Sequence, residues 1–137
     1  MSTRNPYSQY VENQVKTAAP GKLLLMAYDA AIRFGNSARE KMKERNIPEQ
    51  SANITKMQNI LLELISSLNP KADEKLAANL DALYTYMFDR LTQASIRDEL
   101  KALEEVLQIL TELRAVWAEA DQMIILSGEG RQEMAAA

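Results

Sequence analysis

The sequence predicts an all-α protein, an antiparallel up-down four-helix bundle with a short N-terminal helical cap segment. Three observations lead to this fold class. Apolar residues recur every three or four positions along four long stretches, which is the spacing of one helix face. Short breaks separate these stretches, and two of the breaks contain proline. The 137 residues suit one domain, and no stretch alternates as a β-strand does.

We expect three segments along the chain: a mobile N-terminal cap over residues 1–19, the bundle over 20–126 and a disordered tail over 127–137. In the cap, Tyr7 and Tyr10 fall on one side of a short helix. A helix of that length is not stable alone, so it must dock on the bundle or stay mobile. The tail has two glycines and no apolar periodicity.

The first bundle helix is predicted from Pro20 to about Lys43. Proline is tolerated at the first helical position, where no N–H is needed. Gly21 and Gly35 lower the helix propensity. The repeating positions are Leu24, Ala27, Ala31, Phe34, Ala38 and Met42. Several of these residues are small, so a neighbouring helix can approach closely.

The second helix is predicted to begin after Asn46, which with Glu49 three residues later resembles a capping box. Its apolar face is Ile54, Met57, Leu61, Leu64 and Leu68. Between Ile60 and Leu68, six of nine residues are apolar, which is wider than one packing partner requires. Asn69 and Pro70 are expected to end this helix.

The third helix is predicted over residues 72–94. Its apolar face is Leu76, Leu80, Leu83, Met87 and Leu91. Tyr84, Tyr86 and Phe88 lie beside this face, and the tyrosines bring polar groups that a closed core does not easily accommodate.

The fourth helix is predicted to begin at Ser95 almost without a loop, because Ser95 and Asp98 fit a capping-box pattern. Its apolar face is Leu103, Val106, Leu110, Leu113, Trp117, Ala120 and Ile124.

No catalytic, cofactor-binding or metal-binding residue is predicted. The chain has no histidine and no cysteine, which removes the commonest general base, the commonest metal ligand and any thiolate. Bundles can hold metals between inward-facing carboxylates, but Glu104, Glu105 and Glu112 lie beside the apolar face and are interpreted as solvated charges. We therefore expect no enzymatic activity and no cofactor.

The net charge of −3 and the pI of about 5.1 argue against a nucleic-acid partner, which needs clustered basic residues. Neither a signal peptide nor an uninterrupted run of 18 apolar residues is present, so we expect a cytoplasmic protein without membrane insertion.

A partner-binding groove is predicted between the second and third helices, where methionines can repack against different partners. The candidate lining on periodicity alone is Met57, Ile60, Leu62, Ile65, Tyr84, Met87 and Phe88. An amphipathic helix fits such a groove. Alternatively, the excess apolar surface meets the N-terminal segment or a second copy of the chain.

A set of short segments, in fixed order, carries a resemblance to a known family. They are Asn5-Pro6-Tyr7, Tyr10, Pro20, Leu23, Leu25-Met26-Ala27-Tyr28-Asp29, Asn53-Ile54, Lys56, Gln58-Asn59-Ile60, Leu64, Ala78-Asn79-Leu80-Asp81-Ala82-Leu83-Tyr84, Tyr86-Met87, Arg90-Leu91, Ala94, Leu103-Glu104-Glu105-Val106 and Trp117. From Asn5 to about Ala120 the chain resembles the FliS family of flagellar secretion chaperones. Ala19, Ala30 and Ser95 depart from that pattern, but each suits a helix or its end.

The resemblance implies a flagellin export chaperone. Family members bind the C-terminal segment of flagellin, which is disordered when free and partly helical when bound, and deliver it to the export apparatus. Other flagellar regulators are further possible partners, and a structural homodimer without flagellin binding is the alternative function. The expected partner-binding residues are Tyr7, Tyr10, Ile54, Met57, Asn59, Ile60, Leu61, Leu64, Leu76, Asn79, Leu80, Leu83, Tyr84 and Met87.

Overall fold

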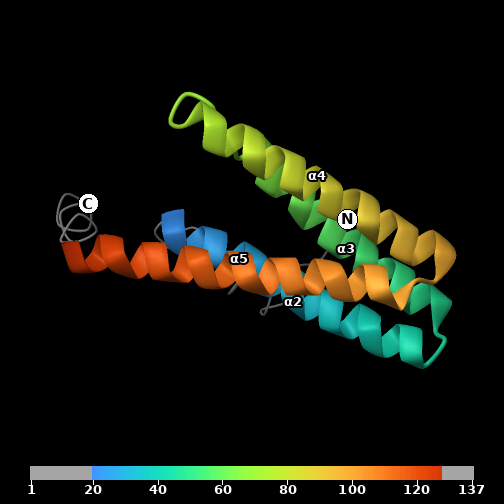
Figure 1. Cartoon of the computed structure of the whole chain (residues 1–137). Coiled ribbons are helices and arrows are strands. Elements are labelled where there is room, and N and C mark those ends of the chain that lie inside the picture. Colours follow the sequence, from blue (N-terminus) through green and yellow to red (C-terminus); the bar gives the residue numbers. More distant parts are fainter. Residues whose placement is uncertain (1–19, 128–137) are drawn as a thin grey trace, which may run out of the picture. The chain divides into compact units, whose positions relative to one another are not determined.

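The computed structural model describes residues 20–127 and confirms the predicted all-α fold class. Within these residues the chain forms four helices and no strand (Figure 1). They are α2 (Pro20–Lys43), α3 (Ile47–Ser66), α4 (Glu74–Arg97) and α5 (Leu100–Ser127). The cap expected over residues 1–19 lies outside the described residues, as does the tail beyond residue 127, so both stay predictions.

The chain divides into two compact units, and each is described by itself. The larger unit is Ala27–Arg114, and among the described residues the smaller one combines 20–26 of α2 with 115–127 of α5. All of α3 and α4 belongs to the larger unit, together with most of α2. The bundle limits expected at residues 20 and 126 stay a prediction.

The turn between α2 and α3 closes with local hydrogen bonds. Arg45 has a left-handed backbone (φ 58), which ends α2. The N–H of Asn46 donates to the carbonyl of Lys41 at 2.9 Å, as in a Schellman motif. The side chain of Asn46 accepts from the N–H of Glu49 at 3.2 Å. The predicted cap of the second helix is therefore confirmed.

The predicted start of the fourth helix at Ser95 is wrong. Ser95 lies inside α4, which continues to Arg97, and Asp98 takes a left-handed backbone whose N–H donates to the carbonyl of Ala94. The carboxylate of Asp98 accepts from the fully buried Gln50 side chain at 3.0 Å. The Asp98 carboxylate is therefore bound by a residue 48 positions away in the sequence and does not form the predicted capping box with Ser95.

The other end of the α3–α4 hairpin also differs from the prediction. α3 ends at Ser66, before Asn69 and Pro70, and the N–H of Ser67 donates to carbonyls of the last turn. α4 begins after Asp73, whose side chain accepts from the N–H of Leu76 at 3.0 Å. Asp73 is thus the N-cap of α4, as its residue type favours.

Buried side chains from all four helices form the core of the larger unit. They are Tyr28, Ala31, Ala38, Met42, Ile54, Met57, Leu61, Leu64, Ala77, Tyr84, Met87, Leu91, Ala94, Ala102, Leu103, Val106, Leu107 and Leu110. The burial of each large apolar side chain contributes about 1.5–3 kcal/mol. α3 and α4 pack against each other along their length and run in opposite directions (Figure 1).

In the smaller unit, the first turn of α2 lies against α5. A methyl group added at Gly21 would collide with the carboxylate of Asp121. The first turn of α2 has no acidic residue of its own. The missing side chain of Gly21 therefore lets a negative charge from α5 approach the positive end of the α2 dipole.

In the larger unit, Gly35 is buried at the contact of three helices. A methyl group at Gly35 would lie 2.9 Å from the terminal methyl of Met57 on α3 and would collide with Leu107 on α5. The cost of glycine to helix propensity is therefore offset by close packing.

We predict that Gly35→Ala lowers the free energy of unfolding by about 1–3 kcal/mol, because the added methyl overpacks the core. At an unstrained helix position the same change would stabilise the protein by roughly 1 kcal/mol. Urea unfolding followed by circular dichroism measures the difference. Asn36→Ala, at the exposed neighbouring position, is the control, and a stabilised Gly35→Ala variant would contradict the packing argument.

Candidate partner-binding site

The structure separates the predicted site residues into two groups. Six are buried in the core: Ile54, Met57, Leu61, Leu64, Tyr84 and Met87. Six others keep accessible surface: Asn59, Ile60, Leu76, Asn79, Leu80 and Leu83. Tyr7 and Tyr10 lie outside the described residues. The apolar faces of α3 and α4 therefore serve mainly the core, and accessible side chains occur at their margins.

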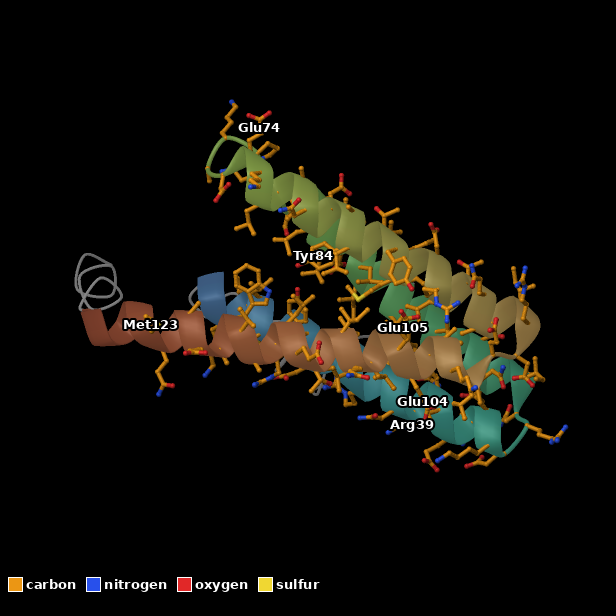
Figure 2. The ribbon with its side chains drawn as sticks, in the orientation of Figure 1. Arg39, Glu74, Tyr84, Glu104, Glu105 and Met123 are labelled. Carbon is orange, nitrogen blue, oxygen red and sulfur yellow. The ribbon has the colours of Figure 1, made fainter. Side chains whose placement is uncertain are left out.

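The accessible apolar surface of α4 is a row of three leucines, here named the leucine edge: Leu76, Leu80 and Leu83. The side chain of Leu76 is 45% exposed, and the other two are half-buried. Asn79 lies exposed on the same side of the helix. The edge begins in the first turn of α4, where Glu74 marks the helix start in Figure 2.

On α3, the accessible apolar residues lie toward two sides. Leu62 is 50% exposed, and Ile65 is half-buried next to it. Ile60 is half-buried on another side of the helix. Of the residues proposed from periodicity for a groove, Leu62 is thus the most accessible. Phe88 on α4 is half-buried.

A hydrogen bond between two buried tyrosines fixes α4 against α2. The hydroxyl oxygens of Tyr28 and Tyr84 lie 2.6 Å apart. Burial raises the pKa of the Tyr84 hydroxyl, and the hydrogen bond with Tyr28 raises it further. The Tyr84 hydroxyl therefore stays neutral, and the polar group that it brings into the core has a partner.

Side-chain hydrogen bonds from three residues of α3 reach α4 and its C-cap. Besides the Gln50–Asp98 bond, the hydroxyls of Ser51 and Ser95 lie 3.4 Å apart. The amide of Gln58 donates to the Thr92 hydroxyl at 2.8 Å and to a backbone carbonyl of α4 at 3.1 Å. These contacts set the register of the two helices, and the register places the leucine edge.

Glu105 of α5 connects α4 and α5 at the surface. Its carboxylate accepts from the Tyr86 hydroxyl and from the Arg90 guanidinium, each at 2.7 Å. Arg90 also donates to Gln93 at 2.6 Å. Figure 2 shows Glu105 on the side of α5 that faces α4 and Glu104 on another side.

The contacts of Glu105 favour its charged form. Hydrogen bonds from Tyr86 and then from Arg90 lower the pKa of the Glu105 carboxyl. The same bonds raise the pKa of the Tyr86 hydroxyl and of the Arg90 guanidinium. Sequence reasoning missed this contact, since it treated Glu105 as a solvated charge. Its place next to the apolar face of α5 was a weak signal, because the sequence does not show that Tyr86 and Arg90 of α4 lie opposite it.

Other parts of the described chain show no competing site. Across residues 20–127, no cluster of acidic side chains could hold a metal ion, and no helix is long and apolar enough to span a membrane. A shallow depression lies on α2 between Asp29 and Lys41, where one helix supplies its lining. Asp29 also pairs with Arg114 of α5. This depression does not coincide with the predicted site.

Known proteins are similar to this chain in sequence over most of its length. Residues 3–123 match the family described as flagellar protein FliS. The chain belongs to the FliS family. The flagellar secretion chaperone FliS of Bacillus subtilis is 37% identical over 122 residues, which cover 89% of this chain and 90% of the relative. The flagellar secretion chaperone FliSB of Pseudomonas aeruginosa is 32% identical over 118 residues, or 85% of this chain and 94% of the relative.

Membership of the FliS family confirms the resemblance seen in the sequence. The FliS of Vibrio cholerae, also named a flagellar secretion chaperone, is 30% identical over 107 residues, or 78% of this chain and 79% of the relative. The family is one of chaperones rather than enzymes. A chaperone of flagellar secretion acts on a protein partner, so accessible apolar surface is the feature that matters most.

We predict that Tyr84→Phe lowers the free energy of unfolding by about 0.5–1.5 kcal/mol, because it removes the hydrogen bond between the two buried hydroxyls. Tyr28→Phe is expected to lower the free energy of unfolding by a similar amount, because it removes the same hydrogen bond. The double variant is expected to cost less than the sum of the single variants, since both hydroxyls of the pair are then absent. Chemical denaturation measures all three, and strict additivity would contradict the coupling.

We predict a pH-dependent effect of Glu105→Gln. The pKa of Glu105 is lowered from 4.5 by its partners, so its carboxylate stabilises the fold above that pH. This stabilisation is lost as the pH falls through the lowered pKa. The wild type is expected to unfold at a higher temperature than the variant at pH 7, with the difference shrinking below pH 4.5. Thermal unfolding at a series of pH values tests this, and a constant difference would argue against it.

Proposed function

We propose that this chain is a non-enzymatic, cytoplasmic export chaperone that binds the C-terminal segment of flagellin. The observation that carries the proposal is the leucine edge, a row of apolar side chains that continues the core face of α4 to the surface. Membership of the FliS family supports a protein client of the flagellar secretion system.

An amphipathic client segment suits this surface. Leu76, Leu80 and Leu83 are spaced by four and three residues, so they present apolar groups along one side of α4. A helical client with the same spacing places its own apolar side chains between them. Asn59 of α3 and Asn79 of α4 are exposed and offer amide groups to the client backbone.

The buried site residues act indirectly in this proposal. Met57, Tyr84 and Met87 have at most 1% of their surface exposed, so they hold α3 and α4 in place without meeting the client in this conformation. A substitution at these positions would change stability first. Client contacts are therefore tested at the accessible positions.

Binding would order a segment that is disordered when free. Coupled folding buries a wide apolar surface and costs a few kcal/mol in ordering. While bound, the flagellin segment cannot pair with other flagellin molecules, so polymerisation before export is prevented. Release at the export apparatus completes the cycle. Other flagellar regulators with amphipathic segments would compete for the same edge.

Isothermal titration with a peptide covering the C-terminal segment of flagellin from the same organism tests the proposal. One-to-one binding with a large negative heat-capacity change is expected, because apolar surface is buried as the segment folds. No heat at any of several temperatures, with a folded chaperone and a soluble peptide, would overturn it.

We predict that Leu76→Asp and Leu83→Asp each weaken peptide binding at least about tenfold, because each places a charge in the apolar contact. The fold is expected to be retained, since both side chains keep accessible surface. Ala78→Asp, at an exposed position on another side of α4, is the matched control and should bind as the wild type does. Wild-type affinity in both leucine variants would remove the edge from the binding site.

The alternative function, a structural homodimer without flagellin binding, uses accessible apolar surface for self-association. Sedimentation of the purified chain distinguishes the two. A dimer that persists at nanomolar concentration and loses its stability in Leu76→Asp would favour the homodimer. A monomer that binds the peptide would favour the chaperone.

A further inference from the structure

An aromatic ring continues the leucine edge toward the middle of α4. Tyr86 follows Leu83 by three residues, and Leu83 follows Leu76 by seven, so the three lie on one side of the helix. The Tyr86 side chain is 44% exposed. Its hydroxyl donates to Glu105 of α5 at 2.7 Å, so the tip of the side chain is held while the ring stays accessible.

Glu105, which accepts the hydrogen bond of the Tyr86 hydroxyl, is held in place by a second contact. Glu105 also accepts from Arg90 at 2.7 Å, and the side chain of Arg90 is only 22% exposed. Arg90 is fixed in turn by its bond to Gln93. The Tyr86 hydroxyl therefore meets a carboxylate whose position is set by a second, less exposed contact between the same two helices.

We infer that Tyr86 is the aromatic end of the client-binding edge and that Glu105 is a positioning residue that orients its ring. This inference rests on the proposed function and extends it beyond the leucines. A ring that is already oriented loses little conformational freedom when a client packs on it. Tyrosine suits this role because it offers a large apolar surface with few rotatable bonds and a polar tip.

The client chemistry follows from the order of the side chains. A client helix that packs along Leu76, Leu80 and Leu83 reaches Tyr86 one turn further on. At that position an apolar client side chain would lie across the ring. The Glu105 carboxylate is already paired with the Arg90 guanidinium, so the ring rather than a net charge selects the client residue, and an apolar side chain is expected there.

Three single variants and one double variant distinguish the contribution of the Tyr86 ring from that of its hydrogen bond to Glu105. Affinity for the flagellin C-terminal peptide is measured by titration. Tyr86→Ala removes the ring and should weaken binding about tenfold. Tyr86→Phe keeps the ring but removes the hydroxyl that donates to Glu105, and Glu105→Ala removes the acceptor of the same hydrogen bond. Each should therefore weaken binding by a similar factor, smaller than that of Tyr86→Ala. The double variant Tyr86→Phe/Glu105→Ala should bind no more weakly than either single variant.

Controls separate positioning from stability. Glu104→Ala removes the adjacent exposed carboxylate and should leave affinity unchanged. Glu105→Gln keeps an acceptor for the Tyr86 hydroxyl and should bind more tightly than Glu105→Ala. If Glu105→Ala proves unfolded by circular dichroism, Glu105→Leu, which removes the carboxylate acceptor but keeps a side chain of similar size, takes its place in the cycle with Tyr86→Phe.

The outcomes distinguish this inference from the proposed function. Additive losses in the double variant, or wild-type affinity in both Tyr86→Ala and Glu105→Ala, would overturn the inference. If Leu76→Asp weakens binding in the same series, the proposed function stands without it. Absence of binding by the wild-type chain would overturn both together.

Discussion

The hydrogen bond between Tyr28 and Tyr84 constrains the larger unit, because a buried hydroxyl must find a partner or destabilise the fold. This requirement fixes the rotation of α4 about its axis relative to α2. With Tyr84 turned inward, Leu76 and Leu83 are placed at the margin of the core. The position of the accessible edge of α4 thus depends on this buried polar contact together with the hydrogen bonds between α3 and α4.

Local sequence signals were sufficient for most of the fold. The three-and-four spacing of apolar residues predicted four helices, and Asn46 predicted the start of one of them. The start at Ser95 was mispredicted because the role of Asp98 depends on Gln50, which is 48 residues away in the sequence. A capping box is a pattern of neighbouring residues, so it carries no information about such a competitor.

The candidate site was only partly predictable, for a similar reason. Periodicity identifies the side of a helix that is apolar, but it does not say where the core ends along that side. Met57 and Leu76 look equivalent in the sequence, yet one is fully buried and the other nearly half exposed. Glu105 has an ordinary sequence context, and only the register of α4 and α5 brings Tyr86 to it.

The contacts between α3 and α4 hold one end of the hairpin more firmly than the other. In the described chain, the side-chain hydrogen bonds from α3 to α4 and its C-cap come from Gln50, Ser51 and Gln58, and no such bond is formed beyond Gln58 toward the end of α3 at Ser66. Toward residues 67–73, only apolar packing joins the two helices, and such packing has no fixed bonding geometry to break. Local unfolding of the hairpin should therefore begin at that loop and extend no further than Gln58, where side-chain hydrogen bonds hold the two helices together. Amide hydrogen exchange along α4 would then be fastest in its first turns and slowest near Ala94.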